Sequence, residues 1–349
     1  MDKYLEEDLV RIAEKCGEFK DLSGKSILVT GATGLVGSMI VKAFVKMNEL
    51  MDAGIKILAM IRDENKADVI YNDVDKSSIE YLVGDLSDSI RTDCDVDYII
   101  HTASPTASKF FVEHPVETLG IAIDGVRNVL DFAKNKKVKG VVYLSSMEAF
   151  GNVGDMGSKV KEDTLGYIDI HSVRSSYSEG KRVCELLCSC YAAEYGVPVK
   201  IARLAQTFGA GIPYTENRVF AQFAKSAINK TDIVLHTKGL SEGNYCYTAD
   251  AIIGIITILV KGENGEAYTV VNEETHTTIA GMAKMVADKI ADGEIKLVFD
   301  IPEDALTYGY APDVKLFLSS EKLNSLGWKA EISLEEAYRR MIASMLASR

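Results

Sequence analysis

The sequence predicts an α/β protein built on a doubly wound parallel sheet, and two observations support this prediction. Short apolar runs alternate with segments of helical periodicity along most of the chain. The first apolar run ends in three glycines spaced G-x-x-G-x-x-G, at Gly31, Gly34 and Gly37, and an apolar helical segment follows at once. A strand, a glycine turn and a helix in this order are typical of a Rossmann-type fold, whose site lies at the carboxyl ends of the strands.

The individual elements follow from the same alternation. Helical spacing of apolar residues is clearest at Leu35–Leu50, Val116–Asn135 and Ser176–Tyr195. Strands are expected where short aliphatic or β-branched runs are bounded by polar or glycine-containing segments. These runs are Ser26–Thr30, Ile55–Ile61, Ile79–Val83, Tyr98–His101, Gly140–Ser145, Val199–Arg203 and Ile233–His236.

The domain organisation is predicted from changes in this pattern. After Gly209 the pattern becomes irregular and helical, which indicates a smaller, mostly C-terminal lobe for the substrate. The segment Tyr245–Val260 is expected to return to the main sheet, because it contains an apolar helix. The expected units are an N-terminal amphipathic helix (1–24), a Rossmann domain (25–208, with 243–262 returning to it) and the substrate-binding lobe (209–242 and 263–349).

Composition disfavours several classes of protein. The 349 residues are 47% hydrophobic and 26% charged, which is ordinary for a soluble globular chain. A formal charge of −12 argues against nucleic acid as a partner. The longest apolar runs are too short to span a membrane, and the six cysteines lack the paired spacing of metal ligands. We therefore expect a cytoplasmic protein with free thiols, without a metal site and without a membrane partner.

The glycine turn predicts a site for the pyrophosphate of a dinucleotide. A turn without Cβ atoms lets backbone N–H groups and the positive end of the following helix approach the phosphates. The third glycine would let helix and strand pack closely. The alternative is a turn that serves packing alone. The expected cofactor contacts here are Gly31, Thr33, Gly34, Leu35, Val36 and Gly37.

A second group of residues predicts proton transfer. Tyr177 and Lys181 lie four residues apart on an expected helix, so their side chains share one face, and the ammonium group can lower the pKa of the phenol. Ser146 ends the strand that precedes this helix and can hold the same substrate oxygen. The alternative for the Tyr-Lys pair is a solvated helix face.

With these motifs, the chain resembles the extended short-chain dehydrogenases/reductases of the epimerase/dehydratase family. Gly84-Asp85-Leu86 resembles the adenine-contacting turn of that family, and the stretch from Arg203 to Gly209 resembles its R-x-x-N-x-Y-G motif. The nearest subgroup is the UDP-glucuronate decarboxylases, to which four stretches are similar: His101–Ser108, His114–Thr118, Tyr177–Arg182 and Asn217–Val219. The resemblance covers most of the chain from Gly24 onward.

The resemblance implies roles for further residues. For the cofactor it adds Arg62, Asp85, Leu86, Thr102, Ala103, Ser104 and Lys181. For a nucleotide-sugar substrate it implies Ser104, Gln206, Arg218 and Val219. It also implies a symmetric homodimer that packs through residues 116–135 and 176–195, with Leu186, Leu187 and Tyr191 beyond the catalytic turn.

The chain also departs from its relatives. Gly243 stands where the family usually has an arginine that contacts the substrate's diphosphate or carboxylate, which leaves Arg218 as the candidate cation and disfavours UDP-glucuronate. Met147 stands where dehydratases carry an aspartate that protonates the departing hydroxyl, which disfavours 4,6-dehydration. Ala122 and Gln206 each replace an asparagine of the family.

The choice of cofactor depends on the end of the second strand. A carboxylate there bonds the ribose 2′-hydroxyl of NAD, whereas an arginine receives the 2′-phosphate of NADP. Arg62 and Asp63 both follow that strand, so NAD is favoured and NADP stays open.

The predicted mechanism begins when Tyr177, as phenolate, takes the proton of a sugar hydroxyl, at C4, while hydride passes to the nicotinamide. Lys181 would hold the nicotinamide ribose, Ser146 the reacting oxygen, and Glu148 would act as second base or position water, unless it only caps the next turn. Two other functions stay open: an NADPH-dependent reductase of a small carbonyl compound, and a nucleotide-sensing protein without catalysis.

Overall fold

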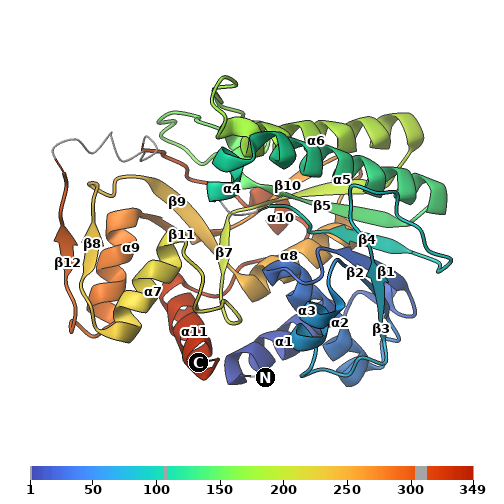
Figure 1. Ribbon diagram of the computed structural model, residues 1–349, viewed down its shortest axis with the longest axis horizontal. Helices are drawn as coiled ribbons and strands as arrows, with labels where there is room; N and C mark the ends of the chain where they lie inside the picture. Colours follow the sequence, from blue (N-terminus) through green and yellow to red (C-terminus); the bar gives the residue numbers. More distant parts are fainter. Residues whose placement is uncertain (1, 106–107, 303–312, 349) are drawn as a thin grey trace.

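The central feature of the fold is a seven-stranded sheet in which all neighbouring strands are parallel (Figure 1). The computed structural model describes residues 2–105, 108–302 and 313–348. The strand order is β10-β6-β5-β4-β1-β2-β3, so the chain reverses direction across the sheet between β1 and β4. Ligands of such sheets bind at this reversal, outside the carboxyl ends of the strands. The strands are β1 Ser26–Thr30, β2 Lys56–Ile61, β3 Ile79–Val83, β4 Tyr98–His101, β5 Gly140–Ser146, β6 Val199–Leu204 and β10 Ala267–Val270.

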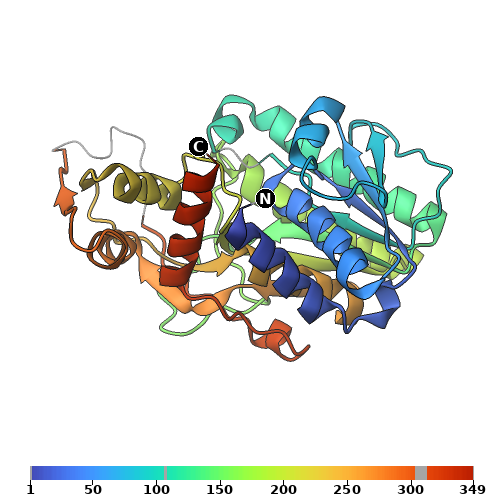
Figure 2. The ribbon, with the colours of Figure 1, turned by 90° about the horizontal axis from the view of Figure 1, so that it is seen from below.

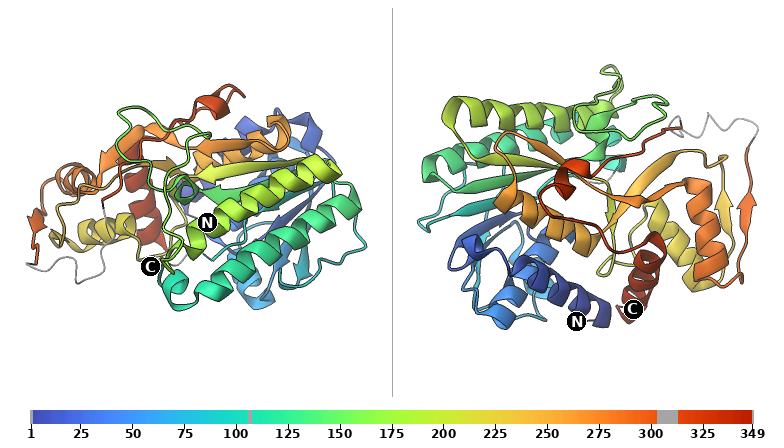
Figure 3. Two further views of the ribbon diagram at one scale, coloured as in Figure 1. Left: turned by 90° about the horizontal axis from the view of Figure 1, so that it is seen from above. Right: turned by 180° about the vertical axis from the view of Figure 1, so that it is seen from behind.

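Helices cover both faces of this sheet. The long helices α5 (Pro115–Lys136) and α6 (Ser175–Tyr195) lie side by side on one face, and α2 (Leu35–Met51) and α8 (Thr248–Lys261) lie on the other (Figures 1 and 3). A hydrophobic core lies on each face of the sheet, and successive side chains of a strand point into one core or the other. Ile27 and Val29 belong to the core under α2 and α8, whereas Leu28 belongs to the core under α5 and α6. Two short helices, α3 (Glu64–Ile70) and α4 (Ser108–Glu113), complete this part.

The second part of the molecule is a smaller lobe beside the sheet (Figure 2). It contains a three-stranded sheet in the order β11-β9-β7 and a parallel pair, β12 with β8. Its elements are β7 Gln206–Phe208, α7 Val219–Asn229, β8 Ile233–Leu235, β9 Glu242–Tyr247, β11 Asn272–Thr278, α9 Ile279–Met285, β12 Leu297–Phe299 and α11 Leu334–Ala347. The short helix α10 (Glu321–Asn324) lies against β10 of the main sheet. Short turns of helix occur at η1 Lys20–Leu22, η2 Met147–Phe150 and η3 Val286–Ile290.

The N-terminal helix α1 (Lys3–Cys16) packs between the Rossmann helices and α11 of the lobe. Its apolar face is buried, and the carboxylate of Asp8 is buried with it. The Tyr247 hydroxyl donates to Asp8 at 2.6 Å, and a guanidinium nitrogen of Arg340 donates to the other oxygen at 3.2 Å. Residues 1–24 were expected to form one helix, but the helix ends at Cys16 and a separate turn, η1, follows.

The structure corrects the sequence-based assignment of the outermost strands. Ile233–His236 was expected among the strands of the main sheet, but β8 pairs only with β12 in the lobe. The seventh strand is instead β10, within the range 263–349 that was assigned to the lobe. In the segment 243–262, β9 belongs to the sheet of the lobe, and only α8 returns to the Rossmann domain. The described part of the chain contains no helix that is long and apolar enough to cross a membrane.

Candidate active site

In the glycine turn between β1 and α2, packing explains two of the three glycines but not the middle one. Gly31 has a φ of +65°, and a Cβ atom there would lie 2.8 Å from the backbone of Ala103. A Cβ at Gly37 would overlap the carbonyl oxygen of Gly31. Gly34 has neither constraint, because its φ of −84° suits any residue and a Cβ would meet only the Gly31 oxygen, at 3.2 Å. The middle glycine therefore leaves a cradle that a side chain would fill, as a pyrophosphate site requires.

The ends of β1 and β4 form the floor beside this cradle. The Thr102 hydroxyl donates to the carbonyl oxygen of Thr30 at 2.7 Å, so it braces the glycine turn. The Thr30 hydroxyl and His101 Nδ1 are 2.7 Å apart in the buried core, and burial lowers the pKa of His101 to about 3. Ala103 and Ser104 follow on this edge, and the Ser104 hydroxyl donates to the carbonyl oxygen of Pro105 at 3.2 Å. Thr106 and Ala107, in the stretch that resembles the decarboxylases, lie outside the described residues.

The predicted adenosine side of the site lies at the ends of β2 and β3. Arg62 is exposed, and its guanidinium group lies 3.8 Å from the carboxylate of Asp85. Asp85 accepts the Ser87 N–H at 2.9 Å, a backbone hydrogen bond that lowers the pKa of the carboxyl. Leu86 is held by its carbonyl oxygen, which accepts from the Asn128 amide at 2.8 Å. Asp63 is engaged elsewhere: its carboxylate caps α3 by accepting the Lys66 N–H.

Tyr177 and Lys181 lie on the first turns of α6, which places both next to the end of β5. The Tyr177 ring stacks on Phe111 of α4, with centroids 4.3 Å apart and an angle of 11° between the planes. Lys181 is buried, its ammonium group donates to the Leu144 carbonyl oxygen at 2.8 Å, and it lies 5.7 Å from the Tyr177 ring centroid. Ser146 ends β5, and its side chain is near enough to Tyr177 to lower the pKa of the phenol. The three predicted catalytic groups therefore converge.

In the protein alone, desolvation of Tyr177 opposes the lowering of its pKa that was expected from Lys181. Desolvation raises the pKa of the Tyr177 phenol to about 12, and the hydrogen bond with Ser146 and the charges of Arg174 and Arg218 offset it only partly. Burial also lowers the pKa of Lys181 to about 8. The spacing on the helix was predicted correctly, but desolvation opposes charge on both side chains, of which Lys181 is buried and Tyr177 partly buried.

Glu148 is held by two neighbours on α6 and its N-terminal flank. Two guanidinium nitrogens of Arg174 donate to the two carboxylate oxygens of Glu148, at 3.0 and 3.1 Å. The Ser178 hydroxyl donates to Oε2 at 2.8 Å. The backbone N–H of Glu148 donates to Ser146 Oγ at 3.2 Å, so the strand end and the acidic turn are one unit. A carboxylate with this many donors is fixed in orientation.

The predicted substrate residues come from the lobe. Arg218 precedes α7 and contributes its charge at Tyr177, but its guanidinium is paired with Glu216 at 2.8 Å. Val219 begins α7 and is exposed, and Gln206 begins β7. Gly243 lies in β9 without a positive φ, and a Cβ there would meet nothing within 4 Å. Open space, rather than a compensating side chain, therefore surrounds the position of the missing arginine.

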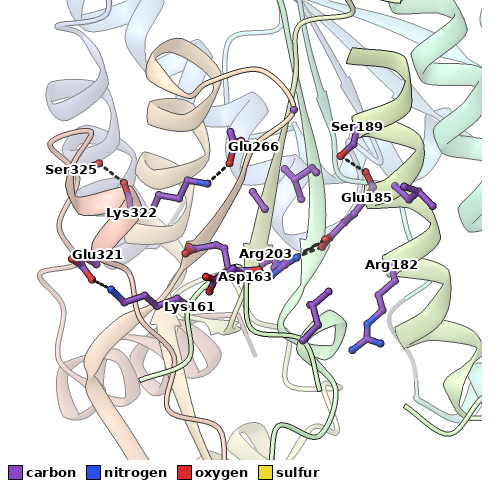
Figure 4. A pocket seen from close by; sticks show the side chains of 16 residues that line it. Lys161, Asp163, Arg182, Glu185, Ser189, Arg203, Glu266, Glu321, Lys322 and Ser325 are labelled. Carbon is purple, nitrogen blue, oxygen red and sulfur yellow. Dashed lines mark hydrogen bonds and ion pairs between the residues drawn. The ribbon is translucent and has the colours of Figure 1, made fainter. Parts of the chain in front are cut away.

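A cavity of about 770 Å³ lies elsewhere, between α6, β6, β10 and α10 (Figure 4). Neither Tyr177 nor the glycine turn lines it. Its base is the buried pair Arg203–Glu185, 2.7 Å apart, and pairs such as Lys161–Glu321 and Lys322–Glu266 cross its rim. We therefore assign the active site from the convergent side chains, and not from the volume of this cavity.

Sequence reasoning missed Arg174, Phe111 and Glu216. Arg174 lies three residues before Tyr177, so the motif could have included it. Phe111 gave no signal, because its contact with Tyr177 joins segments that are distant in the sequence. The described residues contain no group of acidic, histidine and cysteine side chains that could hold a metal ion.

The Rossmann-type sheet, the glycine turn and the Tyr177–Lys181 pair form the arrangement that is expected of a dinucleotide-dependent enzyme. Comparison with known families agrees with this class. Residues 27–272 match the model of the NAD dependent epimerase/dehydratase family, and the chain belongs to that family.

Individual relatives fit the same assignment. UDP-glucuronic acid decarboxylase 6 from Arabidopsis thaliana is 27% identical over 90% of this chain and 87% of its own. UDP-glucuronic acid decarboxylase 1 from Danio rerio is 26% identical over 91% of this chain and 72% of its own. The fold is similar to that of UDP-glucose 4-epimerase from Thermotoga maritima, with a TM-score of 0.76, 20% identity and coverage of 93% of this chain and 99% of that one.

Proposed function

We propose that this protein converts a nucleotide sugar through a transient 4-keto intermediate, with NAD as a cofactor that is regenerated within each turnover. The observation that supports this most directly is the convergence of Ser146, Tyr177 and Lys181 at the sheet edge that also bears the glycine cradle. The family membership and the names of the relatives, which act on UDP-glucuronic acid or UDP-glucose, support the substrate class. The comparisons offer no support for a reductase of small carbonyl compounds.

The residues of this chain divide the work as follows. NAD fits the cradle around Gly34, and the nicotinamide would accept and return a hydride. Tyr177 removes the proton of the sugar 4-hydroxyl and later returns it, while Ser146 holds the same oxygen. Lys181 holds the nicotinamide ribose and keeps a proton donor beside the Tyr177 ring. A 4-keto group acidifies the neighbouring C–H and labilises a neighbouring carboxylate, which permits epimerisation or decarboxylation.

We propose that the substrate is a nucleotide sugar other than UDP-glucuronate. Gly243 leaves open space where a cation is usual, and Arg218 is already neutralised by Glu216. No free cation therefore faces a sugar carboxylate from these two positions. Met147, in place of an aspartate, argues against 4,6-dehydration as the second step.

NAD is favoured over NADP at the adenosine end. Asp85 lies beside Arg62, so a carboxylate is present where a 2′-phosphate would otherwise bind the arginine. The proposed contacts are those of the cradle, Thr33, Leu35, Val36, Leu86 and the strand-end residues Thr102, Ala103 and Ser104.

We further propose a symmetric homodimer in the cytoplasm. The outer faces of α5 and α6 expose apolar side chains, including Val116 and Leu186, which are 77% and 63% exposed. Leu187 and Tyr191, which were also expected at this interface, instead pack toward α5, and the Tyr191 hydroxyl donates to Asp131. The cysteines of the described chain are free, in keeping with a reducing compartment.

One experiment tests the proposed function. The shift in melting temperature is measured with UDP-, CDP-, GDP- and dTDP-sugars in the presence of NAD, and each sugar that stabilises the protein is then incubated for product analysis. We expect one nucleotide series to stabilise the protein and to be converted without net change in NADH absorbance. If no nucleotide sugar binds, or if NADPH is consumed with a simple carbonyl compound, the proposal is wrong.

A further inference from the structure

Arg174, three residues before Tyr177, contacts two different parts of the proposed site. Arg174 is the residue that precedes α6, and it reaches back across the site to η2. Its guanidinium group forms a two-pronged pair with Glu148, and its Cζ atom lies 5.1 Å from the centroid of the Phe111 ring. Phe111 in turn stacks on Tyr177. One side chain thus contacts both the acidic turn and the ring that supports the phenol.

The geometry of the pair restricts what Glu148 can do. Oε1 accepts from Arg174, whereas Oε2 accepts from both Arg174 and Ser178. Ser178 also lies on α6, so the same helix that presents Tyr177 holds the carboxylate from two positions. The planar guanidinium fork fits a carboxylate in one orientation, which a lysine cannot reproduce.

We propose that Arg174 is a positioning residue, which fixes the Glu148 carboxylate and the Phe111–Tyr177 stack in one arrangement and balances the negative charge next to the phenol. The proposal rests on the proposed function for its kinetic consequence, but not for its structural one. In the site without substrate, Glu148 is then the partner of an ion pair with Arg174, and not an unpaired base.

The charges around Tyr177 give the proposal a direction. Glu148 raises the pKa of the phenol, whereas Arg174 lowers it, so the two charges oppose each other at the same atom. The other groups that face Tyr177 are Lys181 on α6, Arg218 before α7, and Ser146 and Tyr143 on β5. Loss of Arg174 alone leaves Glu148 uncompensated, and loss of Glu148 alone leaves Arg174 uncompensated.

The test replaces each partner and both together: Arg174→Met, Glu148→Gln and the double variant. A fluorinated tyrosine, which has a lower intrinsic phenol pKa, is incorporated at position 177 and its ionisation is followed by fluorine NMR. We expect the titration to move to higher pH in Arg174→Met, to lower pH in Glu148→Gln, and back toward the wild-type protein in the double variant. Arg174→Lys keeps the charge and loses the fork, so its shift should be smaller than that of Arg174→Met.

The matched control is Arg339→Met on α11. Arg339 also pairs with a glutamate, Glu335, at 3.0 Å and with similar exposure, but on α11 of the lobe, and within the described part of the chain it makes no hydrogen bond or ring contact with Tyr177 or Phe111. The Arg339→Met substitution should leave the titration of the fluorinated tyrosine at position 177 unchanged. Melting curves of every variant show which are folded. If Arg174→Met does not fold, the titrations of the two single variants Arg174→Lys and Glu148→Gln still show whether Arg174 and Glu148 act on Tyr177.

The kinetic readout follows the same logic. With the substrate found above, the acidic limb of the pH profile of kcat should move upward in Arg174→Met, with turnover about tenfold lower on that limb, and should return in the double variant. A merely structural role would lower kcat without moving the limb. The proposal is overturned if Arg174→Met titrates like the wild-type protein, or if the double variant keeps the full shift of Arg174→Met. A protein that turns over no nucleotide sugar would refute the proposed function, while the fluorine titration would still decide the role of Arg174.

Discussion

Substitution of Gly34 should weaken cofactor binding without unfolding the protein, and the backbone geometry explains why. The φ of −84° at this position suits any residue, and a new Cβ would need only a few tenths of an ångström of movement by the Gly31 carbonyl group. We therefore expect Gly34→Val to change the free energy of unfolding by no more than about 1 kcal/mol. Its branched side chain would occupy the space of the pyrophosphate, so the affinity for NAD should fall at least about tenfold, or about 1.4 kcal/mol.

The control for this prediction is Gly37→Ala, three residues further along the same turn. A Cβ there would overlap the Gly31 carbonyl oxygen and lie 2.8 Å from Thr102 Oγ1, so α2 must move away from β1. We expect this variant to lose about 1 to 3 kcal/mol of stability, as overpacked sites do. Calorimetric titration with NAD and chemical denaturation measure the two effects separately. Undiminished NAD binding by folded Gly34→Val would show that the cradle is not the cofactor site.

Three further predictions concern catalysis, the substrate and pH. Tyr177→Phe should lower turnover by about two to four orders of magnitude and leave NAD affinity nearly intact, because it removes only the proton-transfer group; activity within threefold of the wild-type protein would contradict this role. Gly243→Arg should fold normally, since a side chain there meets open space, and it should tighten the binding of nucleotide diphosphate sugars. The natural protein should convert UDP-glucuronate poorly. Rapid release of carbon dioxide from UDP-glucuronate by the natural protein would refute the argument from Gly243. Burial raises the pKa of Asp8 from 3.8 to about 6, so the folded state favours the protonated carboxyl. As pH rises from about 4 to above 6, the wild-type protein should lose up to about 3 kcal/mol of unfolding free energy relative to Asp8→Asn. Denaturation curves of both proteins at pH 4 and pH 7 measure this loss. A difference in unfolding free energy that is the same at both pH values would disprove the prediction.

Periodicity predicted the parts of the fold that depend on local pattern. The strands β1, β4 and β5 are apolar runs that are buried almost throughout, and such runs are visible without knowledge of their neighbours. The strand β10 was not predicted, because it is short and its strand conformation depends on pairing with β6. Such pairing joins segments that are distant in the sequence, so a local pattern does not show it.

The site was predictable where its chemistry lies within a short stretch. Tyr177 and Lys181 share a helix face by spacing alone, and Ser146 ends a recognisable strand. The ion pairs Arg174–Glu148 and Arg218–Glu216 were not predicted, because spacing along the chain does not show which acid a given arginine meets. The raised pKa of Tyr177 was missed for a related reason, since burial depends on Phe111 and other residues that the motif does not contain.

The position of α1 has a practical consequence for anyone who shortens this chain. The family match begins at residue 27, which suggests that a protein trimmed to that boundary would be complete. Yet Leu9, Ile12, Ala13 and Cys16 of α1 are fully buried, and Asp2 accepts the hydroxyl of Ser344 from the other end of the chain at 2.8 Å. Trimming would lay bare the apolar surfaces of α8 and α11 and leave Arg340 without Asp8. The stretch that matches the family model is therefore shorter than the part of this chain that shares one hydrophobic core.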